Sequence, residues 1–233
     1  MKKSILTSIL LFFAFSYCAA QNKGYVSFSI GPSFPSGDFG SKAANNASAG
    51  FANTGAVLDI SFAYKIGNNL GFTGMLKGQA NSIDNNTFAN ELSRQIGGSW
   101  TVESKPWSLG GLMAGLYGSF PLSEKVSIDT RAMLGYLNAA SPEINVSLDG
   151  SGGSAWVKQS SVSASSLSYL IGGGFKFDVG DKTCLLLNID YLHSKPEFKN
   201  VTTTSSNGGV PIQSTYTLNM ESVNVGFGIG LRL

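Results

Sequence analysis

The sequence has very few residues of the kinds that bind metals or form disulfides. Among its 233 residues are two cysteines, Cys18 and Cys184, and one histidine, His193. Zinc and iron–sulfur sites need several such ligands. If the first segment of the chain is removed, Cys184 has no partner and is expected to be a small buried apolar residue. We therefore expect no metal, no cofactor and no internal disulfide.

Charged residues are also scarce, and their two signs balance. They make up 13% of the chain, with 16 Lys and Arg against 14 Asp and Glu, about half the usual share of about 25%. Loss of Lys2 and Lys3 with the first segment would leave 14 residues of each sign. A neutral chain lacks the basic surface that binds nucleic acid, so we expect no nucleic-acid partner.

Long apolar runs are missing from residues 21–233, which excludes a membrane-spanning helix. Residues 1–20 differ: the basic pair Lys2-Lys3 precedes a mostly apolar run, Ile5 to Phe15, and the small residues Cys18-Ala19-Ala20. This pattern predicts a secretory signal peptide cut after Ala20. An acylated Cys18 is the alternative, disfavoured by the bulky Tyr17 before it. We expect residues 21–233 to form one domain.

Glycine and aromatic residues are abundant, and apolar and polar residues alternate with a period of two. There are 29 glycines, and 11% of the chain is aromatic. The alternation marks eight segments: residues 25–34, 55–66, 70–81, 108–120, 126–138, 165–179, 183–194 and 221–233. Short turns at 67–69, 121–125 and 180–182 alternate with long connections at 35–54, 82–107, 139–164 and 195–220. These lengths predict an all-β, eight-stranded antiparallel up-and-down transmembrane barrel with short periplasmic turns and four long external loops.

One face of these strands is apolar along its whole middle, as in Val26, Phe28 and Ile30 of the first segment. Across the middles of all eight segments this face has no Asp, Glu, Lys or Arg. A cation at the bilayer midplane would cost about 2–4 kcal/mol, so we expect this face to meet lipid. A soluble barrel would have its apolar face inside instead. Aromatic residues fall near both ends, as two interfacial girdles would require: Tyr64, Phe120 and Phe177 near the turns, and Phe34, Tyr136, Tyr169 and Tyr191 toward the long loops.

The opposite face carries polar, charged and small residues. Its charged members are Asp59, Lys65, Lys77, Asp129, Arg131, Lys176, Asp178, Asp190 and Arg232. An eight-stranded barrel is just wide enough for side chains to fill its interior. We therefore expect these residues to form an ion-pair network that fills the lumen, with a selective pore as the alternative.

The last strand ends in Gly228, Leu231 and Leu233, a spacing that resembles the C-terminal signal by which the assembly machinery of outer-membrane barrels recognises its substrates. Members of that class commonly end on an aromatic residue, whereas Leu233 ends this chain. Pairing of this strand with the first would close the barrel and remove its open edge.

The signal, the eight amphipathic strands and the last strand together resemble the small outer-membrane barrels of the OmpA/OmpX type. The stretches GPSFPSGDF (Gly31 to Phe39) and DTRAMLGYLNA (Asp129 to Ala139) resemble the outer-membrane β-barrel domain common in Bacteroidetes. The resemblance implies an outer-membrane location, contact with outer-membrane lipid and recognition by the barrel assembly machinery. It implies no single activity.

Some small outer-membrane barrels modify lipid A with a serine that a histidine activates. Here His193 and Ser194 are adjacent, so their side chains point to opposite faces of a strand, and we expect no enzyme. We expect a structural, adhesive or surface-binding role in which the loops meet an extracellular ligand. A narrow channel for ions or small solutes is the alternative, and a lipid A enzyme is less favoured. The large loop residues are expected to cap the lumen rather than bind a partner: Phe51, Phe88, Leu92, Trp100, Trp107 and Trp156.

Overall fold

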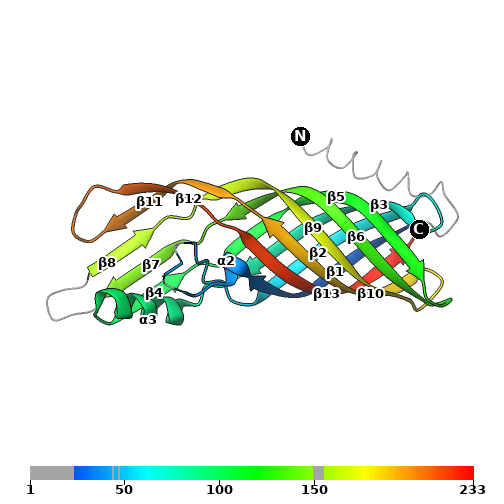
Figure 1. The fold of residues 1–233 in the computed structure, drawn as a ribbon, viewed down its shortest axis with the longest axis horizontal. Coiled ribbons are helices and arrows are strands. Elements are labelled where there is room, and N and C mark those ends of the chain that lie inside the picture. The colour runs from blue at the N-terminus through cyan, green and yellow to red at the C-terminus, as the bar shows by residue number, and fades with distance from the viewer. Residues whose placement is uncertain (1–23, 44, 47, 149–154) are drawn as a thin grey trace, which may run out of the picture.

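Eight long antiparallel strands close into a barrel (Figure 1). This computed structural model describes residues 24–43, 45–46, 48–148 and 155–233, so the predicted signal peptide lies outside the described residues. The barrel strands are β1 (Gly24–Ser36), β2 (Gly55–Lys65), β3 (Leu70–Asn81), β5 (Trp107–Pro121), β6 (Val126–Ala140), β9 (Ser163–Asp178), β10 (Thr183–Ser194) and β13 (Met220–Arg232). They follow the order β1-β13-β10-β9-β6-β5-β3-β2 around the wall. Each predicted segment is thus a barrel strand, and the predicted fold class is confirmed.

The first and last strands make the closure. They pair from Tyr25 and Arg232 at one end to Ser36 and Glu221 at the other. The N–H of Leu233 also donates to the carbonyl of Gly24, at 2.9 Å. The barrel therefore has no free strand edge, as a wall in contact with lipid requires.

The two ends of the barrel differ. The three short connections join β2 to β3, β5 to β6 and β9 to β10, and we call this end the turn end. The other, loop end carries the four long connections, which hold the helices α2 (Gly37–Gly40) and α3 (Asn85–Ile96) and five further strands: β4 (Trp100–Ser104), β7 (Ile144–Leu148), β8 (Ala155–Gln159), β11 (Glu197–Ser205) and β12 (Ile212–Thr217). No helix in the described part of the chain is long and apolar enough to span a membrane.

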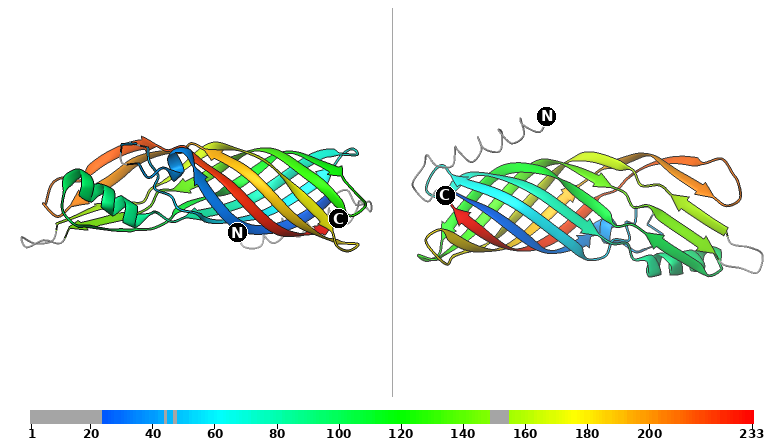
Figure 2. Two further views of the ribbon diagram at one scale, coloured as in Figure 1. Left: turned by 60° about the horizontal axis from the view of Figure 1, so that its bottom comes forward. Right: turned by 180° about the vertical axis from the view of Figure 1, so that it is seen from behind.

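The five additional strands correct the expectation of plain loops. They form an open sheet in the order β12-β11-β8-β7-β4, which we call the outer sheet. Figure 2 shows it beyond the mouth of the barrel, at the end away from the C-terminus. Val102, Val146 and Val157 lie side by side on neighbouring strands, and such β-branched residues favour strands. The loops therefore continue part of the barrel wall outward.

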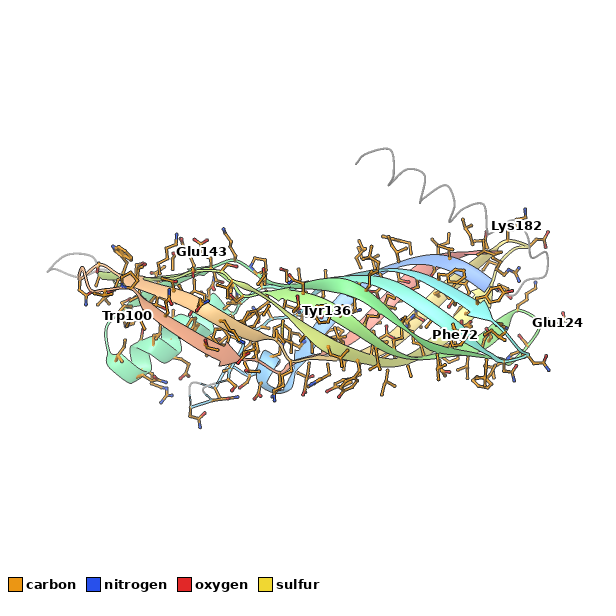
Figure 3. All side chains as sticks on the ribbon, turned by 90° about the horizontal axis from the view of Figure 1, so that it is seen from above. Phe72, Trp100, Glu124, Tyr136, Glu143 and Lys182 are labelled. Atoms are coloured by element: carbon orange, nitrogen blue, oxygen red, sulfur yellow. The ribbon has the colours of Figure 1, made fainter. Side chains whose placement is uncertain are left out.

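The outward face of the barrel is apolar, as predicted. Leu112, Leu116, Leu134 and Ile171 expose between 60% and 68% of their surface. A strand rises about 3.3 Å per residue and tilts by about 40°, so each residue advances about 2.5 Å along the barrel axis. Figure 3 shows Phe72 and Tyr136 on this wall, with the charged Glu124 and Lys182 at the turn end and Trp100 and Glu143 at the loop end.

The inward face also carries large apolar side chains, which corrects the expectation of only polar, charged and small residues there. The half near the loops is mixed, because Ser33, Gln79, Asn81 and Ser222 are buried in it as well. Six apolar side chains in the middle and loop half of the lumen are at most 3% exposed: Met75, Met113, Met133, Leu137, Leu170 and Leu192. We call these six residues the apolar plug. Methionine is unbranched and flexible, so it fills the irregular space inside a narrow barrel.

Candidate functional sites in the lumen and at the loop end

A buried ion pair joins β2 and β3 inside the barrel. Asp59 and Lys77 are direct cross-strand partners. The Lys77 ammonium donates to both carboxylate oxygens of Asp59, at 3.1 and 3.3 Å. The two side chains are 0% and 5% exposed, so neither charge has bulk water as an alternative partner. Loss of either residue would leave the other as an uncompensated buried charge.

A second buried pair joins β6 to β10 across the intervening strand β9. Gly172 on β9 is the cross-strand partner of both Arg131 and Asp190. The Arg131 guanidinium donates from Nε to one Asp190 oxygen at 2.7 Å and from Nη2 to the other at 2.5 Å. A β-carbon on Gly172 would collide with the Asp190 carboxylate. The missing side chain at Gly172 therefore makes this bidentate contact fit.

Asp129 is the centre of a third cluster. Its carboxylate accepts hydrogen bonds from the Tyr117 hydroxyl at 2.7 Å, the Tyr25 hydroxyl at 3.3 Å and the Ser127 hydroxyl at 3.3 Å. The Lys176 ammonium lies 3.9 Å from the same carboxylate and 5.5 Å from the centre of the Tyr25 ring. The cluster therefore combines an ion pair, three hydroxyl donors and a cation–π contact.

Two further predicted lumen residues pair at the turn end. The Arg232 guanidinium lies 3.1 Å from Asp178 and also donates to the Gly180 carbonyl. Lys65 is half-buried and has no ion pair with any residue that the structure describes. Of the nine charged residues singled out in the sequence, the structure thus arranges eight as four pairs and leaves Lys65 apart.

The lumen is filled by these groups. Beside Arg131 and Asp129, a cavity with a volume of about 10 Å³ separates Tyr25, Tyr117 and Asn188. A single water molecule needs about 10–15 Å³ of such space. Leu137, Leu170 and Leu192 of the apolar plug lie beyond Arg131 and Asp190 toward the loops and are 0% exposed.

Sequence reasoning missed the tyrosines and methionines of the lumen. Tyr117 lies an even number of positions from Met113 along β5, and both side chains point inward. The signal was present, because this parity is the one that period-two alternation assigns to the interior. The charged and small members of that face were the ones from which its role was predicted.

His193 and Ser194 lie on opposite sides of the wall, as the alternation predicts. His193 packs on the Tyr169 ring, with centroids 5.0 Å apart, and its Nδ1 lies 3.5 Å from a Glu221 oxygen. Ser194 is fully buried inside, where its hydroxyl lies 2.7 Å from that of Ser166. The histidine therefore cannot accept the serine proton. In the described part of the chain, no group of His, Cys, Asp and Glu side chains could hold a metal ion.

An apolar core continues from the plug into the loop end. Trp107 is 5% exposed, its ring lies 6.0 Å from Phe39 and 5.8 Å from Phe198, and its Nε1 donates to the Gly50 carbonyl at 2.9 Å. Of the loop residues expected to cap the lumen, only Trp107 is fully buried. Phe51, Phe88, Leu92 and Trp100 are half-buried, and Trp156 on β8 is 44% exposed.

A polar contact ties the first long connection to α3. The Lys42 ammonium donates to Asp84 at 2.5 Å and to the Asn53 side chain at 2.8 Å. Asp84 is the N-cap of α3, where its other oxygen accepts the Thr87 N–H at 3.1 Å. The hydrogen bonds from Lys42 and from Thr87 hold the pKa of the Asp84 carboxyl below its usual value.

Replacing Asp84 by Ala removes both contacts and is expected to destabilise α3 by about 1 kcal/mol, the usual cost of losing an N-cap. Amide hydrogen exchange in α3 should accelerate about fivefold. Asp84→Asn is the matched control, because it keeps an acceptor for Thr87 and loses only the charge. Because the pKa of Asp84 is lower in the folded state, its ionisation stabilises that state at pH values above the pKa of the unfolded chain, about 3.9. This stabilisation is lost as the pH falls through the lower pKa of the folded state. Equal exchange in Asp84→Ala and wild type would show that the cap does not hold the helix.

Comparison with known proteins gives one matching family and several solved structures of similar fold. The sequence matches the family model described as outer membrane protein beta-barrel domain over residues 5–231. No curated protein matches it. Among solved structures, the Escherichia coli outer membrane protease OmpT superimposes with a TM-score of 0.52 and 8% identity, covering 92% of this chain and 98% of that one. A major outer membrane protein of Thermus thermophilus gives 0.51 and 11%, covering 90% and 99%. The attachment invasion locus protein Ail of Yersinia pestis gives 0.45 and 17%, covering 91% and 99%. At these identities the likeness concerns the fold alone.

Proposed function

The chain belongs to the outer membrane protein beta-barrel domain family, and from this membership we propose a non-enzymatic, non-conducting role for it. In this proposal the barrel anchors the chain in the outer membrane, and the outer sheet and its loops act at the cell surface as a structural or adhesive element. The observation that carries the proposal is the filled lumen. Four ion pairs lie on the inward face of the barrel, and the buried side chains of the apolar plug fill space on the same face.

A channel needs a continuous wet path, and charged rings favour conduction only where water surrounds them. The charges here bond to each other, and Leu137, Leu170 and Leu192 of the plug are fully buried on the loop side of the Arg131–Asp190 pair. A lipid A enzyme of the serine type is disfavoured by the positions of His193 and Ser194 on opposite faces of β10.

The loop end suits surface binding because its backbone is ordered by strand pairing beyond the barrel mouth. Strand β12 lies at one edge of the outer sheet, and all residues of β12 but one are exposed. An ordered, exposed surface binds with a smaller loss of conformational entropy than a flexible loop does.

Planar-bilayer recording tests the non-conducting proposal. We expect no steady conductance steps from the purified full-length chain at either polarity, because no ion can pass the plug without displacing it. A wide porin recorded in the same bilayers serves as the positive control, and protection of the barrel from added protease verifies insertion. Regular steps of constant amplitude from the inserted chain would contradict the proposal and favour the channel.

A further inference from the structure

The loop end contains a cavity that the filled lumen does not explain. Its volume is about 340 Å³, at the lower end of the range of about 300–1,000 Å³ found for small-molecule sites. It lies between the segment around Phe51, the helix α3, the outer sheet and Leu218, which precedes β13. Its lining includes Phe51, Phe88, Trp107, Ile144 and Tyr216.

The aromatic walls of this cavity are held in place from behind. Phe51 and Phe88 pack against each other with centroids 4.9 Å apart, and Tyr216 packs on Phe198 at 5.2 Å. Trp107 is fixed by two ring contacts and by its hydrogen bond to Gly50. A site whose walls are already in position loses little entropy when a ligand enters.

The polar groups in the lining exclude several classes of ligand. None of the described lining residues is charged, so an ionic ligand would lose hydration without gaining a counter-charge. The Asn46 amide already bonds to Asp38 and to the Ser48 N–H, and the Trp107 N–H bonds to Gly50. The Gln159 side-chain amide has no hydrogen-bond partner among the residues that the structure describes. The hydroxyls of Ser48, Tyr216 and Thr217 complete the polar lining, and the remaining side chains are aliphatic or aromatic. A sugar, which has hydroxyls on every side, would leave those that face the apolar walls without partners.

We propose that this cavity binds a neutral, mainly apolar small molecule that has an aromatic ring and one hydrogen-bonding group. The ring packs against Phe51, Phe88 and Trp107, and the polar group bonds to the Gln159 amide. The inference rests on the proposed function in one respect, namely that the loop end is the working part of the chain. It assigns the cavity a ligand class that the family and the fold leave open.

The fluorescence of Trp107 reports whether a ligand occupies the cavity. The chain has three tryptophans, so the variant Trp100→Phe/Trp156→Phe in lipid nanodiscs leaves the fluorescence of Trp107 alone. The probe is 4-bromobenzyl alcohol, a neutral single-ring alcohol whose bromine quenches tryptophan on contact. We expect quenching that saturates in the millimolar range or below.

Two substitutions locate the site. Ala49 lines the cavity, so Ala49→Phe should fill it and raise the half-saturating concentration at least tenfold. Ala43→Phe, in the same connection but exposed, is the matched control and should leave it unchanged. Gln159→Leu should raise it about threefold to tenfold, the effect of one hydrogen bond. Each variant is shown to fold if its unheated sample migrates faster in the gel than its heated, unfolded sample, as the wild type does.

Each other outcome overturns the inference. Quenching that rises linearly and equally in Ala43→Phe and Ala49→Phe would show collisions and no site. Equal binding of 4-bromobenzoate or 4-bromobenzylamine would contradict the neutral ligand class. Protection of Trp107 by methyl β-glucoside at equal concentration would replace the apolar ligand by a sugar. In all three cases a silent bilayer recording would leave the proposed non-conducting role intact, so the two failures are distinguishable.

Discussion

Replacing Arg131 by Ala should cost about 3–5 kcal/mol of the free energy of unfolding, the usual effect of breaking a buried ion pair. The Asp190 side chain is 1% exposed and would lose both guanidinium donors. The lost Coulomb attraction is the smaller part of this effect. The larger part is the cost of a carboxylate that stays buried without a partner, with Gly172 behind it.

Urea unfolding in lipid vesicles measures this effect, and two further variants separate its causes. Arg131→Met/Asp190→Leu removes both charges and should recover most of the lost stability, since apolar replacements of buried pairs are often neutral. Arg94→Ala removes an arginine from the surface pair with Glu91, where the arginine side chain is 68% exposed, and should change stability by less than about 0.5 kcal/mol. If Arg131→Ala were as mild as Arg94→Ala, the lumen would be hydrated rather than packed.

The second large effect is expected on the lipid face, where Leu116→Arg should cost about 2–4 kcal/mol. Leu116 is five residues from the end of β5 at Pro121, which places it about 13 Å into an apolar band of about 25 Å. Its side chain is 63% exposed on the outer wall, so an arginine there would enter the middle of the acyl chains.

Leu122 provides the matched control for this charge. It is 60% exposed and lies just beyond β5 at the turn end, where an arginine reaches water. Leu122→Arg should cost about 0–1 kcal/mol in the same unfolding measurement. Equal costs at the two positions would mean that no depth gradient exists and that the outer wall does not face lipid.

The fold was predictable because the signal repeats in every strand. In β10, Leu185, Leu187 and Ile189 alternate with Asn188 and Asp190, and one such pattern fixes which side faces out. Eight copies separated by alternating short and long connections leave few topologies other than a closed meander.

The partners in the lumen could not be predicted, because they depend on strand register. In the sequence, Arg131 is two positions from Asp129, yet its guanidinium bonds Asp190 on another strand. Asp129 bonds Tyr117 instead. Which residues face each other across β9 is set by the pairing of whole strands, and no local pattern encodes it.

The outer sheet escaped prediction for a different reason. Its strands β4, β7 and β8 are each five residues long and lie in segments rich in Ser, Thr and Asn. Such short strands have weak periodicity of their own. They form here because the barrel strands that precede and follow them already hold their ends side by side.

The orientation of the wall is the central claim, and neighbouring residues on β5 test it most directly. Leu116 is 63% exposed and Tyr117 is 4% exposed at nearly the same depth. In a chain whose three native tryptophans are replaced by Phe, Leu116→Trp and Tyr117→Trp each place a single tryptophan there. In bilayers of lipid brominated in the acyl chains, we expect strong quenching of the tryptophan at 116 and little at 117. Equal quenching at both positions, or stronger quenching at 117, would contradict an apolar face turned to lipid and a lumen closed to it.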